Sequence, residues 1–191
     1  MKKGLLTTVA VVLSFLTFYY INMTKPPELV HRQLNEIADF SNPQLLAGAA
    51  DNVFIGEVIT EVSSRRPDGF PETQYAVQVK KNLKGTLNGN ITVNQLGDFE
   101  KNPAGHRILV LYNEDALLKK GQTYLFATRY LKSEKWHTAF STHGTVELKN
   151  TLETNPSIQQ MTRALQSPIV PDALKNKTNG TIQSSTESVK K

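Results

Sequence analysis

The sequence offers few residue patterns that could carry out a chemical reaction. Its four histidines, His31, His106, His137 and His143, lack the spacing of a zinc site, such as a pair four residues apart on one helix. The chain has no cysteine, which excludes disulfides, thiolate metal sites and cysteine nucleophiles. The serine-hydrolase elbow and glycine-rich phosphate loops are also absent. We therefore expect no catalytic site, no metal site and no cofactor.

Acidic residues in two expected loops are the remaining candidates for catalysis. Asp98 and Glu100 flank Phe99, and Glu114 is followed by Asp115. A cell-wall-active hydrolase that uses dispersed carboxylates such as Asp98, Glu100 or Glu114 is one alternative. Solvated loop charge is the simpler interpretation, because neither run has the repeated spacing of a calcium loop. Two carboxylates that meet in a cleft with a raised pKa would favour the enzyme.

Arginine and aromatic side chains in expected loops and strand ends are the better candidates for binding. Such side chains are enriched in interface hot spots, and loops at the ends of a β-fold carry function. The chain offers Arg65, Arg66, Phe70, Trp136 and Phe140. The alternative is structural: Trp136 and Phe140 would fill the core, and the arginine pair would be solvated surface.

The elements that position these residues are mostly strands. Short β-branched and aromatic runs alternate with turn signals such as Asn88-Gly89, and Gly56 should allow a bend or bulge. Regularly spaced short strands predict a mainly β fold, an antiparallel barrel or sandwich. The expected strands are Asn52–Val62, Thr73–Lys81, Ile91–Gln95, Ile108–Tyr112, Tyr124–Tyr130, Trp136–Phe140 and Gly144–Leu148.

Helices are expected on both sides of the strands. Glu28–Asp39 can form a short amphipathic helix, because its apolar residues fall three and four positions apart. Asn42-Pro43 is a start signal for a second helix, with Asn42 as N-cap. Asn155-Pro156 should begin a C-terminal helix that ends before Pro168. The tail from there to Lys191 has almost no apolar residues, so we expect it to be disordered.

The N-terminus is typical of a membrane anchor. Twenty uncharged residues, Gly4–Met23, follow the basic start Lys2-Lys3, and a helix of that length spans roughly 30 Å. A cleaved signal peptide is the alternative, but the segment ends in Phe18-Tyr19-Tyr20-Ile21, where the peptidase needs small residues. The lysines should stay inside. The rest of the chain would then lie outside the cell, tied to membrane lipid through this helix.

The charge of the chain limits its partners. The net charge is +5, and no segment holds a dense basic block. Nucleic-acid-binding proteins concentrate their charge on one face or arm, so we expect no nucleic acid. An unknown protein, peptide or cell-wall polymer, or an anionic lipid surface, is a more natural partner.

Several phrases of the sequence resemble the netrin-like group, which is related to the tissue inhibitors of metalloproteinases and includes many bacterial cell-surface proteins. They are Asp51–Val58, Val77–Val79 with Leu83–Gly85, and Leu118–Phe126. The resemblance covers about residues 45–150 and implies an OB-fold barrel. The animal inhibitors chelate the metal of a protease through an N-terminal cysteine. Because this chain has no cysteine, that mechanism does not carry over.

These observations predict a chain in five parts with one binding domain. We expect a transmembrane anchor at 1–23, a linker with short helices at 24–50, an OB-like barrel at 51–150, a C-terminal helix at 151–167 and a disordered tail at 168–191. The expected function is that of a membrane-anchored, extracytoplasmic binding module without catalysis. The alternatives are the wall-active hydrolase and a protease inhibitor that does without the cysteine mechanism.

Overall fold

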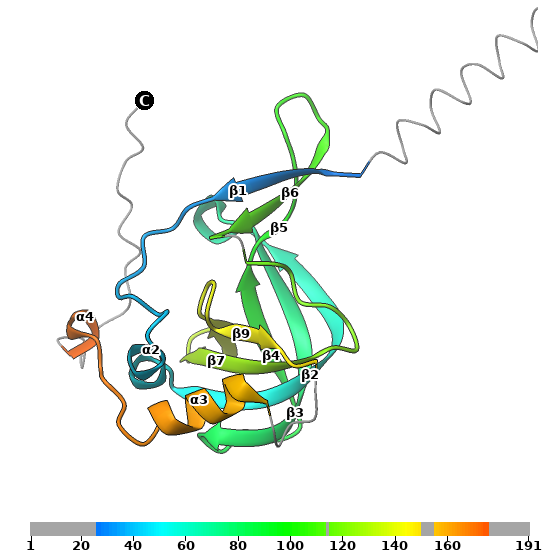
Figure 1. The fold of residues 1–191 in the computed structure, drawn as a ribbon. Coiled ribbons are helices and arrows are strands. Elements are labelled where there is room, and N and C mark those ends of the chain that lie inside the picture. The colour runs from blue at the N-terminus through cyan, green and yellow to red at the C-terminus, as the bar shows by residue number, and fades with distance from the viewer. Residues whose placement is uncertain (1–25, 114, 150–154, 176–191) are drawn as a thin grey trace, which may run out of the picture.

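A computed structural model of the chain describes residues 26–113, 115–149 and 155–175, and Figure 1 shows its fold. The expected anchor at 1–23 and the tail beyond Lys175 lie outside the described residues. Within the described ranges, no helix is long and apolar enough to cross a bilayer. The elements are β1 (Glu28–Arg32), α2 (Pro43–Ala49), β2 (Asn52–Arg65), η1 (Pro67–Gly69), β3 (Glu72–Lys84), β4 (Asn90–Leu96), β5 (Asp98–Lys101), β6 (Arg107–Tyr112), β7 (Thr123–Leu131), β8 (Trp136–Ala139), β9 (Thr145–Glu147), α3 (Pro156–Ala164) and α4 (Asp172–Lys175).

The fold is mainly β, as expected. The larger sheet has the strand order β2-β3-β4-β8-β7-β9, and β2 also pairs with β7. The hydrogen-bonded pairing therefore runs in a closed circuit through β2, β3, β4, β8 and β7. The smaller sheet has the order β1-β6-β5 and lies beyond one end of the larger one (Figure 1).

Most strand pairs are antiparallel, as expected, but two pairs are parallel. Strand β4 pairs with β8 in parallel, with Asn94 opposite Thr138, and β1 pairs with β6 in parallel. The remaining pairs are antiparallel, and the β2–β3 register shifts beside Gly56, as the glycine predicted. A Cβ atom on Gly56 would lie 2.6 Å from the Val77 side chain, so only glycine fits there.

The first part of strand β2 is buried on both faces, which explains its apolar run from Val53 to Ile55, whereas the part from Thr60 onward is mostly exposed. Phe54 and Val58 point into a core enclosed by the circuit of strands, where Phe54 stacks on Phe126 with 5.0 Å between ring centroids. Val53 and Ile55 point the other way, into a second core under α2 and α3. Strand β2 therefore contributes one face to the core inside the circuit of strands and the other face to the core under the helices.

Two helices cover the second core, and both begin where the sequence predicts. Asn42 caps α2 by accepting a hydrogen bond from the backbone N–H of Gln44, at 2.9 Å. Asn155 caps α3 in the same way, with Ser157 as the donor at 3.0 Å. Proline occupies the first turn of each helix, where a missing N–H carries no penalty.

The expected helix at Glu28–Asp39 was wrong, because Glu28–Arg32 forms strand β1 against β6. Strand β5 occupies part of an expected loop, and β2 runs through Arg65 into the expected turn. Asp172–Lys175 forms the short helix α4 within the expected tail. The first of these differences arises from a partner about eighty residues away in the sequence, which local patterns do not report.

Candidate functional site

A cleft of about 390 Å³ opens on the face of β3, β4 and β8 that points away from the enclosed core. The last residue of β2, the loop between β2 and β3, the turn between β7 and β8, and the loop after β1 complete its walls. We call it the Trp136 cleft. Its lining residues are Leu34, Arg65, Pro67, Phe70, Glu72, Asn94, Leu96, Leu131, Glu134, Trp136 and Thr138.

The cleft brings together three of the five binding candidates: Arg65, Phe70 and Trp136. The guanidinium carbon of Arg65 lies 4.2 Å from the centroid of the Trp136 ring. An Nη1 atom of the same arginine lies 3.4 Å from a carboxylate oxygen of Glu134. The stacked cation therefore holds the indole in place while the carboxylate holds the cation.

The remaining wall of the cleft is apolar and belongs to the core under the smaller sheet. Phe70 and Leu96 pack against a cluster that includes Tyr112, and the Phe70 and Tyr112 rings are 6.1 Å apart. Leu34, in the loop after β1, packs against the same cluster. The cleft thus combines an apolar wall with a few polar groups, the usual composition of a small-molecule site.

Several buried polar atoms at the cleft have no hydrogen-bond partner among the residues that the structure describes. They include the Asn94 Oδ1 acceptor and the Trp136 Nε1 donor, which belong to lining residues. Gln74, which faces Asn94 across the β3–β4 pair, leaves its Nε2 donor without a partner, although its Oε1 accepts from Ser63 at 2.7 Å. Asn94 is only 1% exposed. A buried polar group without a partner costs roughly 1–3 kcal/mol; these atoms have almost no accessible surface, so a ligand supplies the missing partners only where the side chains turn toward it.

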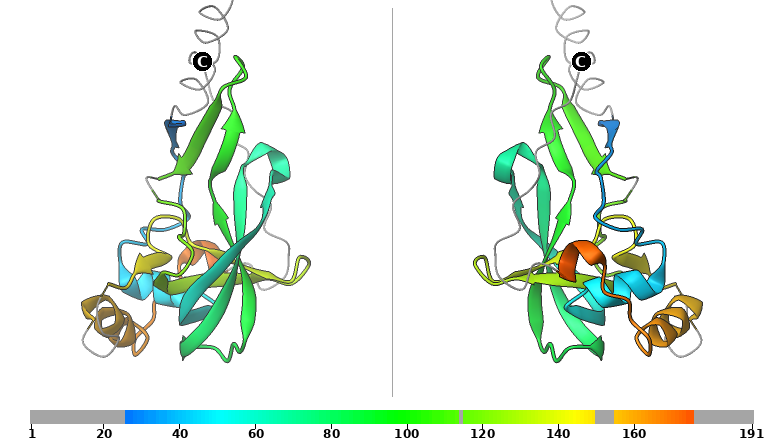
Figure 2. Two further views of the ribbon diagram at one scale, coloured as in Figure 1. Left: turned by 90° about the vertical axis from the view of Figure 1, so that its right-hand side faces the viewer. Right: turned by 90° about the vertical axis from the view of Figure 1, so that its left-hand side faces the viewer.

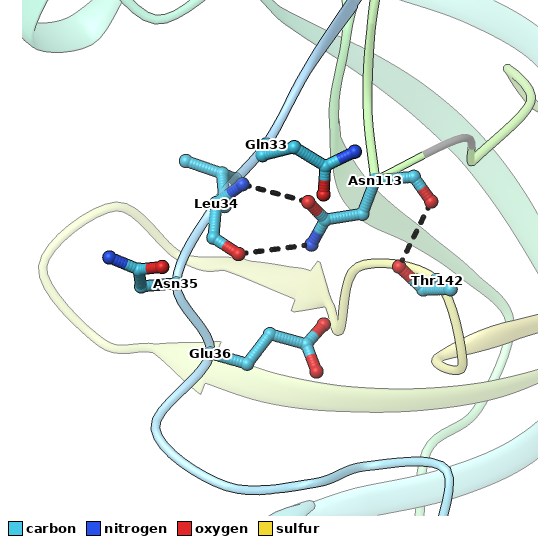
Figure 3. A pocket seen from close by; sticks show the side chains of 6 residues that line it. All are labelled: Gln33, Leu34, Asn35, Glu36, Asn113 and Thr142. Atoms are coloured by element: carbon cyan, nitrogen blue, oxygen red, sulfur yellow. Dashed lines mark hydrogen bonds between the residues drawn. The ribbon is translucent and has the colours of Figure 1, made fainter.

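A second pocket shares the lining residue Leu34 with the cleft. We call it the Asn113 pocket; Figure 3 shows its lining residues, which are Gln33, Leu34, Asn35, Glu36, Asn113 and Thr142. The Asn113 side chain accepts a hydrogen bond from the Leu34 backbone N–H at 2.7 Å and donates one to the Leu34 carbonyl at 3.5 Å. Asn113 therefore fixes the residue that forms one wall of the Trp136 cleft.

The backbone at the Asn113 pocket is held in an unusual conformation. Asn113 has φ +48° and Thr142 has φ +65°, both in the left-handed region. Asparagine tolerates this region, whereas a β-branched threonine adopts it at a cost. The Thr142 hydroxyl donates to the Asn113 carbonyl at 3.3 Å, which links the two residues (Figure 3). The pair is a rigid support for the loop after β1.

Two carboxylates near this support are shifted toward their protonated form. Burial raises the pKa of Glu36, which extends into the pocket in Figure 3, and burial also raises the pKa of Asp115. His143 lies near enough to oppose both shifts. Asp115 accepts a hydrogen bond from the Gln95 side chain at 3.1 Å and does not line either pocket.

The carboxylates suggested for hydrolysis are instead engaged by arginines. Glu100 lies 3.0 Å from Arg32 and 2.9 Å from Arg66, and Asp98 lies 4.0 Å from Arg66. Arg66 also donates to the backbone carbonyl of Phe99. This binding candidate therefore lies beside the Trp136 cleft and holds β5, rather than lining the cleft. Glu114 lies outside the described residues.

The last binding candidate, Phe140, lies far from the cleft in the fold. Its ring packs against Phe40 with centroids 4.7 Å apart, at the edge of the core under α2 and α3. The described residues contain no group of three or more histidine and acidic side chains placed to hold a metal ion. His137 is buried beside Tyr130, with ring centroids 4.9 Å apart.

Sequence reasoning missed Asn94 and Asn113. Asn94 lies inside the expected strand Ile91–Gln95, where a polar residue that alternates with an apolar one needs no special explanation. The short polar run after the Ile108–Tyr112 strand was a turn signal, and asparagine is the residue type that tolerates a positive φ. The special role of Asn113 could therefore have been predicted from the sequence. That of Asn94 could not, because it depends on which elements cover this face of the sheet.

No protein-family model matches the sequence, and no curated protein matches it significantly.

Proposed function

We propose that this chain is a membrane-anchored, extracytoplasmic binding module that holds an N-acetylated glycan of the cell wall in the Trp136 cleft, without catalysis. One observation carries the proposal. An unpaired acceptor, Asn94 Oδ1, and an unpaired donor, Trp136 Nε1, belong to the same apolar-walled cleft. An acetamido group offers one N–H, one carbonyl and one methyl, which match that acceptor, that donor and the apolar wall.

The proposed location of the module outside the cell, attached to the membrane, is argued from its N-terminal sequence. Gly4–Met23 carries no charge and is long enough to span a bilayer, and Lys2-Lys3 favours the inside for the short N-terminus. Bulky residues at the far end of the segment argue against cleavage. With this orientation, the β-domain and its cleft face the cell wall.

The pairing of the larger sheet supports an OB-like barrel of the netrin-like kind. Five strands, β2, β3, β4, β8 and β7, are joined in a closed circuit around one apolar core. OB barrels bind oligosaccharides and oligonucleotides on their second and third strands and the loops beside them. The Trp136 cleft lies on β3 and β4, which are the second and third strands of this circuit, and on the adjoining loops.

The cleft favours a glycan over the other polymers considered. Nucleic acid is disfavoured because Arg65 is accompanied by Glu72 and Glu134, which would repel phosphates. A peptide that binds by strand addition needs a free sheet edge, and both β3 and β4 are paired on each side. Recognition in this cleft must therefore proceed through side chains, which suits a sugar.

The test uses the tryptophan itself, because Trp136 is the only tryptophan of the chain. Full-length protein in detergent micelles is titrated with chitotetraose while the tryptophan emission is recorded. Cellotetraose, which has the same backbone but no acetamido groups, is the matched control. We expect a saturable change in emission with chitotetraose and at least about tenfold weaker binding of cellotetraose, the equivalent of one lost hydrogen-bonding group.

Further measurements distinguish glycan binding from the alternative functions, peptide binding and hydrolysis. Asn94→Val should abolish the response, whereas Glu36→Gln, which changes the Asn113 pocket, should leave it intact. A short peptide that replaces chitotetraose as the effective ligand would point to a peptide-binding module. Shortened oligosaccharides after prolonged incubation would reveal the hydrolase. Equal responses to both sugars, or no response to either, would overturn the proposed glycan.

A further inference from the structure

A β-hairpin made of β5 and β6 projects from the larger sheet and carries its basic residues at the tip (Figure 2). Lys101 and Arg107 face each other across the last pair of the hairpin, and His106 follows at the turn. All three side chains are exposed. The function proposed above makes no use of them.

The hairpin tip is an ordered structure rather than a loose loop. The Asn102 N–H donates to the His106 carbonyl at 2.9 Å, and the Asn102 side chain accepts from the His106 N–H, also at 2.9 Å. The Gly105 N–H closes the turn by donating to the Asn102 carbonyl at 2.8 Å. The tip therefore keeps a fixed position relative to the two strands.

The charges of the hairpin are sorted along its length. The acids Asp98 and Glu100 lie toward its base, where Arg66 contacts both of them. Arg32 makes a further ion pair with Glu100 at 3.0 Å. These acids are thus neutralised within the protein, and the charge that the tip presents to an external surface is positive. The guanidinium of Arg107 packs 3.7 Å above the Phe99 ring, which holds it on the hairpin.

The pairing of β1 directs this tip toward the expected anchor. Strand β1 runs parallel to β6, with Glu28 opposite Ile108, so the chain that precedes Glu28 continues alongside the tip. The hairpin tip extends about three residues, or roughly 10 Å, beyond the pair of Glu28 and Ile108. Only four residues separate Met23 from Glu28, and the five steps between them span at most about 17 Å.

These lengths place the tip close to the lipid headgroups. If Gly4–Met23 spans the bilayer and the hairpin points toward it, the tip comes within about 7 Å of the membrane surface even when the link is fully extended, which is less than a Debye length at physiological salt. Lys25 in the link adds a further positive charge, and Glu28 is the one acid on β1. Lysine and arginine side chains near an anionic surface are attracted to it.

We propose that the β5–β6 hairpin is a membrane-contacting element, which rests its Lys101–Arg107 tip on anionic lipid headgroups and so fixes the orientation of the Trp136 cleft above the bilayer. This inference depends on the anchor in the proposed function but not on the glycan. A short tether alone would let the domain rotate, whereas a second contact restricts it.

The test exploits the absence of cysteine, which makes any introduced cysteine a unique labelling site. Ala104→Cys places a fluorophore at the hairpin tip, in full-length chain reconstituted into phosphatidylcholine vesicles with or without phosphatidylglycerol. Asn88→Cys is the matched control, since the β3–β4 turn lies at the end of β4 remote from β5. Quenching by headgroup-attached nitroxide lipids should be at least about twofold stronger at Ala104→Cys, and only with phosphatidylglycerol present.

The outcomes of this experiment distinguish a failure of the anchor from a failure of the hairpin contact. Reversal of both tip charges, Lys101→Glu with Arg107→Glu, should remove the difference between the two lipid compositions. A chain that does not float with the vesicles would overturn the anchor itself. A chain that floats while the Ala104→Cys label is quenched no more than the Asn88→Cys label would overturn the hairpin contact alone. Equal quenching with and without phosphatidylglycerol would overturn recognition of anionic lipid.

Discussion

The side chain of Arg65 lies over the ring of Trp136, with 4.2 Å between the guanidinium carbon and the ring centroid. The contact joins the last residue of β2 to the first residue of β8. These strands are not neighbours in the sheet, because β3 and β4 lie between them on one side and β7 on the other. The stack therefore closes one end of the Trp136 cleft and sets the position of the indole.

Replacement of Arg65 by methionine tests this contact. Arg65→Met keeps most of the aliphatic stem and removes the cation, so the stack on Trp136 and the ion pair with Glu134 are lost together. The two charged side chains are 37% and 41% exposed, so we expect a loss of only about 0.5–1 kcal/mol in the free energy of unfolding. Chemical denaturation measures this loss, and the emission maximum of Trp136 should shift as its cover is removed. An unchanged emission spectrum would show that the arginine does not cover the indole in solution.

Asn94 offers a test in which stability and binding move in opposite directions. Asn94→Val removes a buried acceptor that has no partner among the described residues and inserts a side chain that suits a strand. The free energy of unfolding should stay unchanged or rise by up to about 1 kcal/mol, because the cost of burying the unpaired group disappears. Chitotetraose binding, measured by calorimetry, should be lost. A variant that is both less stable and still able to bind would assign Asn94 a structural role.

Asn113 permits the effect of its side chain to be separated from that of its backbone. Asn113→Gly accepts the positive φ without strain, whereas Asn113→Ala adopts it at a cost of about 1–2 kcal/mol. Both variants lose the two hydrogen bonds to Leu34. We therefore expect the alanine variant to unfold at a lower denaturant concentration than the glycine variant.

The effect on the Trp136 cleft should follow the side chain of Asn113 instead of its backbone. Leu34 forms one wall of the cleft, so both Asn113 variants should bind chitotetraose several-fold more weakly, by the equivalent of about 1 kcal/mol for a displaced apolar contact. Wild-type affinity in the glycine variant would show that Leu34 keeps its position without the clamp.

The strands of the larger sheet were predictable because their signals are local. Asn52–Val62 and Thr73–Lys81 carry the β-branched alternation themselves, and the two Asn-Pro pairs mark the beginning of their own helices. The first strand was not predictable, because the spacing of Val30, Leu34 and Ile37 suits a helix. In the fold Ile37 is 53% exposed, and Val30 packs beneath a strand some eighty residues away, so no common apolar face exists.

The same distinction applies to the candidate site. Arg65, Phe70 and Trp136 were found by residue type, since arginine and aromatic side chains are conspicuous wherever they fall. Asp98-Phe99-Glu100-Lys101 gave no strand signal, because its charges are compatible with a strand only when Arg32 and Arg66 neutralise them. Those arginines come from distant parts of the chain. The charge pairing that defines the hairpin therefore depends on the tertiary structure.

Acidification should destabilise the fold through His137. This side chain is buried between β7 and β8, 3.5 Å from the Thr128 hydroxyl, and burial lowers its pKa from the usual value of 6.5. Above pH 6.5 the imidazole is neutral in both the folded and the unfolded chain, so it adds no pH dependence. As the pH falls below that value, the unfolded chain takes up a proton that the folded chain refuses, and the free energy of unfolding decreases until the lowered pKa is passed.

The variant His137→Gln should lack this part of the pH dependence, because glutamine does not titrate. Once the two curves are aligned at about pH 8 to remove any constant offset, the denaturation midpoint of the wild type should fall further than that of the variant as the pH drops to about 5. His31→Gln, which removes an exposed histidine from β1, is the matched control. The carboxyl groups of Glu36 and Asp115 titrate in both proteins, so the difference between the curves isolates His137. Parallel curves would mean that the imidazole is hydrated in the folded protein, and the packing against Tyr130 would then not exclude water from this part of the sheet.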